Sequence, residues 1–569
     1  MKVINNMVKK NKMKPERNKF IFVTGGVVSS IGKGLTAASL GSLLEARGFI
    51  VNIMKFDPYL NVDPGTMSPL QHGEVFVTED GAETDLDLGH YERFTNAIMT
   101  KANSVSAGQI YDTVIARERR GDYLGGTVQV IPHITDEIKS RVFEVSNKII
   151  QKNKNIITLV EIGGTVGDIE AQPFFEAIRQ LRLELGSANT ALVHVTYVPY
   201  IAAAGELKSK PTQHSVKELR EIGLQPDFLI CRSEKHIDDA LKIKIGLFCS
   251  VKKENVISAQ DSNSIYDVPI SLSKENFDQL IIKHLDLKSK IPNLDGWKKI
   301  GRIQNNLKKQ VYIAIVGKYV DLKESYKSLH ESLIHAGISN KVKLIIRYID
   351  SEKLDKKNVK LQLKNIQGVL VPGGFGVRGV EGKILAIQYA RENKIPFFGI
   401  CFGMQLAAIE FARHVCGLKN ATSREFLKLN ERTNIKNSTE NSVKHDLIIN
   451  SMEEQRRITD KGGTMRLGTF KCKIKPRSLA LKIYKKELIF ERHRHRYEFN
   501  NDYKNILINK GLSFSGTNPD RDLVEIIEIQ KHPWFIAVQF HPEFKSKPLS
   551  PHPLFVSFVS AAVKKPLKK

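Results

Sequence analysis

Short apolar runs alternate with longer mixed stretches through the first half of the chain. A run of about five apolar residues between turn residues is typical of a buried strand, whereas a repeat near 3.6 residues indicates a helix. Strand patterns occupy residues 20–24, 51–56, 156–160, 190–198 and 228–231, and helical patterns end at residue 46 and cover residues 213–222. Strands that alternate with helices predict a doubly wound parallel sheet.

The same alternation starts again after residue 309. Strands are predicted at residues 311–317, 342–349, 368–371 and 395–398, and helices at residues 325–335 and 406–412. Between the two patterned parts, residues 286–309 are rich in Lys and Asn and show little periodicity. A chain of 569 residues is also too long for one ordinary core. We therefore predict an α/β protein with two doubly wound domains, residues 19–285 and 310–565, joined by a linker at residues 286–309.

Two other segments lack the pattern. Residues 1–18 are polar and basic, with neither the apolar core of a signal peptide nor the Arg/Ser balance of a transit peptide, so we expect a disordered basic arm. Residues 428–461 are rich in Asn, Ser, Lys and Glu, which predicts a surface excursion from the second domain.

Composition excludes several classes of protein. Hydrophobic residues make up 41% of the chain, but no apolar run reaches the roughly 18 residues that span a bilayer. The formal net charge is +26. The lysines are spread along the chain without interleaved aromatic residues, so we expect scattered surface charge and no specific nucleic-acid site. The five cysteines form no C-x-x-C pair, which favours reduced thiols in a cytoplasmic protein over a disulfide framework or a zinc site.

A glycine loop follows the first predicted strand and precedes a helix, an arrangement that cradles phosphate. The loop contains Gly25 and Gly26 and the string Ser29-Ser30-Ile31-Gly32-Lys33-Gly34. Its spacing departs from the usual P-loop, and Gly34 replaces the Ser or Thr that normally contacts Mg²⁺. Lys33 and the loop N–H groups can still bind phosphate. A metal ion at this loop would need carboxylates from elsewhere in the chain.

Two places can supply those carboxylates. Asp85 and Asp87 alternate, so both side chains share one face if the segment is extended. Glu161 ends an apolar run, and an acid at the carboxyl end of a buried strand lies where open α/β sheets bind ligands. That Asp85 and Asp87 merely cap a loop stays open. Farther along, residues 208–213 carry two lysines and two small hydroxyl residues, which suits an anionic ligand, although a solvated charged turn has the same composition.

A cysteine lies at a predicted strand-to-helix turn in the second part. Gly399, Cys401 and Gly403 form a Gly-x-Cys-x-Gly motif, the thiol version of a nucleophile elbow. The flanking glycines allow a tight turn that exposes the nucleophile beside backbone N–H groups and a helix N-terminus. A cysteine nucleophile needs a base with an orienting partner, and His541 and Glu543 fit those roles.

Three motifs therefore occur in order: a glycine turn at residues 373–376, the Cys401 motif, and His541-Pro542-Glu543. Together they resemble the class I (triad) glutamine amidotransferases. The first half resembles the amidoligase partner of that module in the CTP synthase family. This similarity runs from about residue 19 to about residue 563 and includes the strings at residues 23–30, 57–59, 71–77, 89–94, 117–123 and 128–133.

The resemblance implies that the first domain is a P-loop-like synthetase, which transfers the γ-phosphoryl of ATP to O4 of UTP before ammonia displaces phosphate to give CTP. It implies an ATP site formed by Ser30, Ile31, Gly32, Lys33, Gly34, Lys55, Asp87 and Arg232, with Mg²⁺ on Asp87 and Glu161. It implies a UTP site, shared with the feedback inhibitor CTP, formed by Ser29, Asp168, Ile169, Glu170, Lys208, Ser209, Lys210, Pro211, Thr212, Gln213 and Lys244.

For the second domain the resemblance implies that Cys401 attacks the glutamine amide, His541 shuttles the proton and Glu543 orients His541. It implies glutamine binding by Gly374, Phe402, Gly403, Met404, Gln405, Glu425 and Arg496, with the N–H groups of Gly374 and Phe402 facing the oxyanion. The family is activated by GTP, which Arg378 is placed to contact, and forms homotetramers.

Two positions depart from the family pattern: Phe402 replaces the usual Leu, and Val377 replaces the usual Tyr. Because the N–H of Phe402 acts, we expect little loss there, whereas Val377 bears on the strength of GTP activation. Two other readings remain. A different ATP-dependent amidoligase, such as a cobyrinate amidating enzyme, would not need the strings at residues 168–170 and 208–213. A non-catalytic nucleic-acid-binding or filament-forming protein would not need Cys401, His541 and Glu543 together.

Overall fold

The computed structural model describes residues 18–67, 73–147, 156–318, 323–427, 445–451 and 465–567. The chain divides into two compact units. Unit 1 comprises Met1–Val62 and Asp87–Gly301, and unit 2 comprises Asp63–Leu86 and Arg302–Lys569. Residues 63–86 therefore group with the second half of the chain, which the pattern of apolar residues does not predict. The domain boundaries given above stay a prediction.

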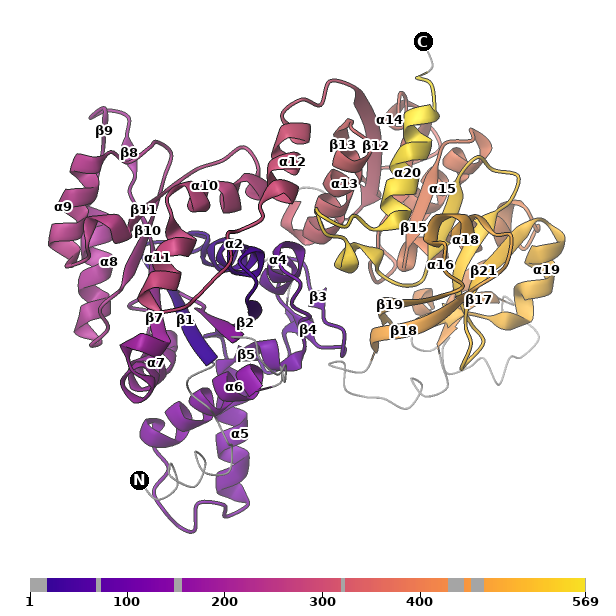
Figure 1. Cartoon of the computed structure of the whole chain (residues 1–569). Helices are drawn as coiled ribbons and strands as arrows, with labels where there is room; N and C mark the ends of the chain where they lie inside the picture. The colour runs from indigo at the N-terminus through magenta and orange to yellow at the C-terminus, as the bar shows by residue number, and fades with distance from the viewer. Residues whose placement is uncertain are drawn as a thin grey trace. The chain divides into compact units, whose positions relative to one another are not determined.

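Unit 1 is built on a seven-stranded sheet in the order β11-β10-β7-β1-β6-β2-β5, in which every pairing is parallel (Figure 1). The strands are β1 (Asn18–Gly25), β2 (Ile50–Asp57), β5 (Ser104–Ser106), β6 (Ile156–Ile162), β7 (Thr190–Tyr197), β10 (Phe228–Ser233) and β11 (Val256–Gln260). Most of their residues are buried and apolar, as expected for a parallel sheet covered on both faces.

Helices cover both faces of this sheet. Phe20 and Phe22 pack in one core with α5 (Ala107–Arg119), α6 (Thr135–Asn147) and α7 (Gln172–Leu185). On β1, β2 and β6 lies α2 (Lys33–Ala46), which also contacts α4, α10 and α11. The remaining elements of this part of the chain are α4 (Asp87–Phe94), α8 (Lys210–Glu221), α9 (Asp239–Cys249), α10 (Val268–Lys274), α11 (Phe277–His284), α12 (Asp295–Gln304) and the short strands β8 (Tyr200–Ile201) and β9 (Glu206–Leu207).

Unit 2 is built on a nine-stranded sheet in the order β13-β12-β14-β15-β23-β22-β21-β18-β19. The first five strands are parallel, and the others continue the sheet antiparallel. Their bounds are β12 (Gln310–Gly317), β13 (Lys343–Asp350), β14 (Gly368–Val371), β15 (Phe397–Ile400), β18 (Arg466–Ile474), β19 (Leu488–His495), β21 (Leu512–Asn518), β22 (Leu523–Ile529) and β23 (Phe535–Val538).

Two separate cores cover the two faces of this sheet (Figure 1). One contains α13 (Lys327–Ser339), α18 (Leu479–Tyr484) and α20 (Pro553–Lys564). The other contains α14 (Val359–Gln362), α15 (Val380–Glu392), α16 (Phe402–His414) and α19 (Lys504–Asn509). Smaller sheets are formed by β16 (Ala421–Ser423), β17 (Asp446–Ser451) and β20 (Tyr497–Phe499), and by β3 (Phe76–Val77) with β4 (Glu83–Thr84).

The α/β fold predicted from the sequence is confirmed, and its strands lie where the apolar runs placed them. Two local predictions are wrong. Asp87 is the first residue of α4, so the segment with Asp85 is not extended. Residues 210–213 form the first turn of α8 rather than a loop, because Pro211 fits an N-terminal helical position. The linker at residues 286–309 stays a prediction, and α12 lies within it with Trp297 and Ile300 buried.

The two polar segments are only partly described. Residues 1–17 lie outside the described residues, and so do residues 428–444 and 452–461 of the expected surface excursion. Between the latter two, β17 pairs with both β16 and β20, so this part of the excursion belongs to a sheet. No described helix is long and apolar enough to cross a membrane. All five cysteines are described, and each is a free thiol.

Candidate active sites

Cys401 lies at a strained turn between β15 and α16. Its backbone has φ 51° and ψ −101°, a conformation that a residue with a side chain rarely adopts. Glycines on both sides make the turn possible: a Cβ at Gly399 would lie 2.8 Å from Cβ of Ala537, and one at Gly403 would lie 2.1 Å from the carbonyl oxygen of Val371. The nucleophile elbow predicted from the sequence is therefore present.

The neighbouring strands bring the other two motifs to the same sheet edge. In the sheet β15 lies between β14, which leads into the glycine turn, and β23, which leads to His541. A Cβ at Gly373 would lie 3.7 Å from Cβ of Cys401 and 2.7 Å from Cε1 of His541. Only a glycine permits this approach, so the turn presents bare backbone to the thiol.

His541 is held by a carboxylate. Its Nδ1 lies 2.7 Å from Oε1 of Glu543, and both side chains are buried. Burial acts to lower the pKa of His541, but the charges of Glu543 and Cys401 outweigh it and raise that pKa to about 10. Nε2, the ring nitrogen on the other side, has no hydrogen-bond partner among the described residues. The imidazole is thus oriented through one nitrogen, and the other is available to a reacting group.

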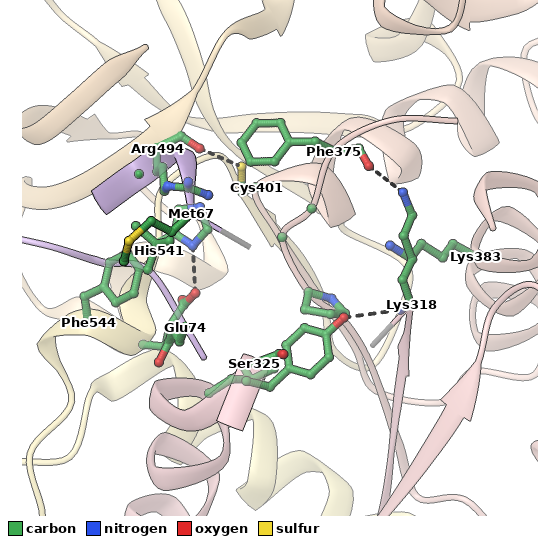
Figure 2. A pocket seen from close by; sticks show the side chains of 18 residues that line it. Met67, Glu74, Lys318, Ser325, Phe375, Lys383, Cys401, Arg494, His541 and Phe544 are labelled. Carbon is green, nitrogen blue, oxygen red and sulfur yellow. Dashed lines mark hydrogen bonds and ion pairs between the residues drawn. The ribbon is translucent and has the colours of Figure 1, made fainter. Parts of the chain in front are cut away.

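A cavity of about 310 Å³ opens at this point of unit 2 (Figure 2). It is lined by the thiol, the histidine and the glycine turn, and also by residues that the motifs did not indicate. These are Gly65, Met67, Glu74, Val75, Lys318, Ser325, Tyr326, Leu329, Pro372, Lys383, Arg494 and Phe544.

Segment 63–86 supplies part of this wall. Its Glu83 accepts a hydrogen bond from Nε of Arg494 at 2.7 Å, and its Glu79 pairs with Arg492 at 3.0 Å. The carbonyl oxygen of Arg494 in turn accepts a weak hydrogen bond from the thiol of Cys401 at 3.6 Å. Sequence reasoning missed this contribution because nothing local in residues 63–86 indicates a partner some 400 positions away.

The expected glutamine-binding residues lie around the turn, but not all line the cavity. Gln405 is buried and donates to the carbonyl oxygen of Tyr497 at 2.9 Å. Glu425 is half-buried, and its Oε1 accepts from the N–H of Gly376 at 2.6 Å. Arg496 lies between β19 and β20. Gly374 lines the cavity, whereas Gln405, Glu425, Arg496 and the first α16 residues Phe402, Gly403 and Met404 lie outside its lining.

In unit 1 the glycine loop joins the end of β1 to the start of α2. Val27, Ser30 and Gly32 have positive φ there. Lys33 is the first residue of α2, and its ammonium donates to the carbonyl oxygen of Gly164. Burial lowers the pKa of Lys33, against the opposite effect of Glu161. The loop therefore combines helix N-terminal N–H groups with a buried lysine, as a phosphate site requires.

Two carboxylates meet beside this loop. A Cβ at Gly34 would lie 2.7 Å from Oδ1 of Asp87 and 3.4 Å from Oε2 of Glu161. Burial, and then the charge of Asp87, raise the pKa of Glu161 to about 7. Against the effect of burial, the charge of Lys55, whose Nζ is 2.5 Å from Oδ2 of Asp87, lowers the pKa of Asp87. Tyr91 also donates to Glu161 at 2.5 Å.

This pair fits a hard divalent cation whose other ligands are phosphate oxygens and water. The carboxylates of Asp87 and Glu161 repel one another, and a cation between them would relieve that repulsion. The described residues contain no group of three or more His, Cys, Asp or Glu side chains suited to a metal on their own. The arrangement therefore suits a cation that arrives with a nucleotide.

A second cavity, of about 320 Å³, adjoins the glycine loop. Arg232 lines it, bonded to Asp261 at 2.8 Å and to the carbonyl oxygen of Ser30 at 3.2 Å. Ile31 and Gly32 of the loop, residues of α2, β7, β10, β11 and α10, and the polar residues Gln260, Asp261, Ser262 and Ser264 also line it. The glycine loop, Arg232 and this cavity lie together, while the ATP site that the family resemblance implies there stays a prediction.

The expected pyrimidine residues occupy two places, in which exposed side chains stand beside the buried Ser209 and Thr212. Asp168 accepts hydrogen bonds from the backbone and hydroxyl of Thr165 at 2.6 and 2.8 Å. Ile169 is 83% exposed, and Glu170 is exposed as well. The second place is the start of α8, with Lys208, Ser209, Lys210, Pro211, Thr212 and Gln213, and Lys244 lies on α9, which packs against α8. Neither place lines the cavity beside the loop, and Ser29 is exposed.

Comparisons with known proteins agree with this geometry. Residues 19–287 match the family described as CTP synthase N-terminus, and residues 321–561 match glutamine amidotransferase class-I. The chain is 67% identical over 549 residues to a CTP synthase of Bdellovibrio bacteriovorus, covering 96% of this chain and 100% of the relative. It is 57% identical to one of Desulfovibrio desulfuricans, covering 96% and 99%, and 56% identical to one of Aquifex aeolicus, covering 96% and 98%.

Proposed function

The chain belongs to the CTP synthase family, and from this premise we propose how its two units divide the glutamine-dependent conversion of UTP to CTP. Unit 2 releases ammonia from glutamine, and unit 1 activates UTP with ATP. The observation that carries the proposal is the meeting of Cys401, His541 and the glycine turn at one cavity in a chain 67% identical to a CTP synthase over its whole length.

In unit 2 His541 takes the proton of the Cys401 thiol, the sulfur attacks the amide carbon of glutamine, and the π electron pair of the carbonyl moves onto its oxygen. The N–H groups of Gly374 and Phe402 stabilise that oxygen, an effect worth about 10²–10³ in rate for one donor in comparable sites. His541 protonates the leaving nitrogen, ammonia departs, and a thioester remains. His541 then takes a proton from water, whose oxygen attacks the thioester carbon; glutamate leaves, and His541 returns the proton to the Cys401 sulfur, while Glu543 holds the imidazole in place.

The substrate's α-amino and α-carboxylate groups are assigned to Glu425, Gln405 and Arg496, with backbone N–H groups of Gly403 and Met404 beside them. Glu425 is anchored to the glycine turn through Gly376, which supports a link between substrate binding and the position of the oxyanion donors. Gln405 is fixed by Tyr497, which follows Arg496.

In unit 1 the loop at residues 30–34 and Lys55 would hold the ATP phosphates, and the cavity beside Arg232 would hold the rest of the nucleotide. Asp87 and Glu161 would hold Mg²⁺, which when bound neutralises charge on the transferring phosphoryl group. Lys33 and Lys55 lie against both carboxylates, so they would keep this cluster near neutrality before the nucleotide arrives.

UTP and the inhibitor CTP would share Ser29, Asp168–Glu170, Lys208–Gln213 and Lys244. The exposure of Ile169 supports a site that another subunit completes, in keeping with a homotetramer. GTP would activate glutamine hydrolysis through Arg378, and the protein would act in the cytoplasm. If the pocket is shared, inhibition by CTP will weaken as UTP concentration rises. Inhibition that ignores UTP concentration would refute the shared pocket.

The central test compares two nitrogen donors. CTP formation from UTP and ATP is measured with glutamine and with ammonium salt at mildly alkaline pH, for the wild type and for Cys401→Ala. The variant loses its covalent nucleophile, so glutamine-dependent turnover should fall by about 10³-fold or more, whereas ammonia-dependent turnover should persist. Equal loss with both donors would make Cys401 a structural residue.

A further inference from the structure

Lys383 has a buried amine for which the described part of the chain provides no hydrogen-bond acceptor. Its side chain is fully buried in α15, and its Nζ has no hydrogen-bond partner among the described residues. Burying a lysine ammonium lowers the stability of the folded state unless another group compensates its charge. Lys383 nevertheless lines the cavity that contains Cys401 and His541 (Figure 2). None of the motifs that define the triad includes it.

The ammonium lies beneath the glycine turn. A Cβ at Gly374 would lie 3.7 Å from Nζ of Lys383 and 3.9 Å from the ring of Phe402. Nζ also lies 5.0 Å from the centroid of that ring. Gly374 and Phe402 are the two residues whose N–H groups face the oxyanion in the proposed mechanism. The amine of Lys383 is thus placed close to both residues that supply the proposed oxyanion donors.

The charged neighbours of Lys383 come from two other elements. Lys318 lies just after β12, and its charge repels that of Lys383. The ammonium of Lys318 donates to the carbonyl oxygens of Phe375 and Gly376. Glu425, in the 3₁₀ turn after β16, attracts it but is bonded to the N–H of Gly376. Burial, and then Lys318, lower the pKa of Lys383 to about 7. The turn is therefore fastened by Lys318 and Glu425, and Lys383 keeps an uncommitted amine behind it.

We propose that Lys383 is a positioning residue for glutamine hydrolysis, whose positive charge stabilises, through the Gly374 turn, the negative charge that builds on the amide oxygen. When the sulfur–carbon bond forms, the carbonyl π pair moves to oxygen, and an anion appears near an amine that is only partly protonated in the free enzyme. The anion favours the protonated amine. When the pair returns and the carbon–nitrogen bond breaks, that charge is lost again. Lys383 forms no covalent bond.

This inference rests on the proposed glutaminase mechanism, and its test separates the two. Lys383→Met keeps the length of the side chain and removes the charge. We expect the kcat of glutamine hydrolysis, measured as glutamate release, to fall about 10- to 50-fold, with KM for glutamine within about twofold. Ammonia-dependent CTP formation should stay unchanged. The thermal midpoint should not fall, because the variant removes a buried amine for which the described part of the chain provides no hydrogen-bond acceptor.

Two further variants make the outcome decisive. Lys383→Arg retains the charge and should recover most of the lost rate, which a purely space-filling role would not predict. Lys360→Met, at an exposed position of α14, controls for loss of a lysine. In the wild type, kcat/KM should carry an ionisation near pH 7 that Lys383→Met lacks. Wild-type kcat in Lys383→Met, or equal loss in Lys383→Arg, overturns the inference while leaving the Cys401 result intact.

Discussion

The carboxylate of Asp87 fills the space that a side chain on Gly34 would need. A Cβ at Gly34 would come within 2.7 Å of Oδ1 of Asp87, with Glu161 just beyond at 3.4 Å. In the usual P-loop a Ser or Thr at this position contacts the metal. Here the loop gives up that hydroxyl, and acidic groups from α4 and β6 occupy the vacated space. The absence of the hydroxyl and the presence of the two carboxylates are thus linked, because the carboxylates leave no room for a side chain at residue 34.

Asp87→Asn tests the metal role. The amide keeps the size of the side chain but removes the charge that a divalent cation requires, so CTP formation should fall by about 10³-fold with glutamine and with ammonia alike. Glutamine hydrolysis in unit 2 should persist. Asp57→Asn is the matched control, because Asp57 also pairs with Lys55, at 3.0 Å, but lies outside the proposed metal pair. An Asp87→Asn enzyme with near wild-type turnover would sink the assignment.

Gly34→Ala tests the steric relationship itself. The added methyl group must displace the Asp87 carboxylate, so the concentration of Mg²⁺ needed for half-maximal CTP formation should rise and turnover should fall about tenfold or more. The double variant with Asp87→Asn is the control. If both changes act on one contact, the turnover of the double variant should be no lower than that of the less active single variant. Additive losses would show that Gly34 matters for another reason.

Much of the two candidate active sites, around Cys401 and around the glycine loop, could be predicted from short stretches of sequence. The Cys401 elbow has a local signature, because an apolar strand, two glycines and a helix follow one another in the sequence. Glu161 is predictable because strand ends in parallel sheets collect ligands. The position of Asp87 was found for the wrong geometric reason, since alternation suggested a strand where α4 begins. The carboxylate of Asp87 does lie beside Gly34 and Glu161, and its role in binding a metal stays a prediction.

Long-range packing could not be predicted in the same way. Nothing within residues 63–86 reveals that Glu83 will bind Arg494 in unit 2. Lys383 did leave a signal: with Val380, Ile384 and Ile387 it occupies the buried stripe of one helix, where a lysine is unusual. Such a signal identifies an exceptional residue but not its neighbours. The turn above it comes from another strand.

A buried acidic pair next to the β18–β19 hairpin predicts how stability changes with pH. Glu498 and Glu525 both bind Arg466, at 3.2 and 2.7 Å. Burial, against the opposing effect of Arg466, raises the pKa of Glu498 to about 8. A raised pKa means that the folded state holds the proton more tightly than the unfolded state. This contribution to stability is therefore complete below about pH 4.5 and is lost as pH rises toward about 8.

Glu498→Gln removes that titration while keeping an acceptor for Arg466. Between about pH 5.5 and about pH 8.5 the thermal midpoint of the wild type should fall, and that of the variant should fall less. The corresponding losses in free energy of unfolding should differ by an amount on the order of 2 kcal/mol. Both proteins are compared by thermal unfolding at the two pH values. An identical pH dependence would place the titrating group elsewhere.

Glu543→Gln, finally, tests whether the carboxylate does more than orient His541. Glutamine can still accept a hydrogen bond from Nδ1, so the ring can keep its position, but the charge that holds the pKa of His541 at about 10 is gone. Burial then acts with less opposition, and the pKa of His541 should fall. The histidine proton should therefore be lost at lower pH than in the wild type, and glutamine-dependent kcat/KM should decline over that lower range. At neutral pH we expect a loss of about 10²-fold or more, with ammonia-dependent CTP formation unaffected.

The measurement is a kcat/KM profile for glutamate release from about pH 6 to about pH 10. Glu543→Ala, which removes the acceptor as well, should be worse at every pH. If Glu543→Gln lost rate without moving the profile, the carboxylate would serve orientation alone, and its charge would play no part in holding the proton.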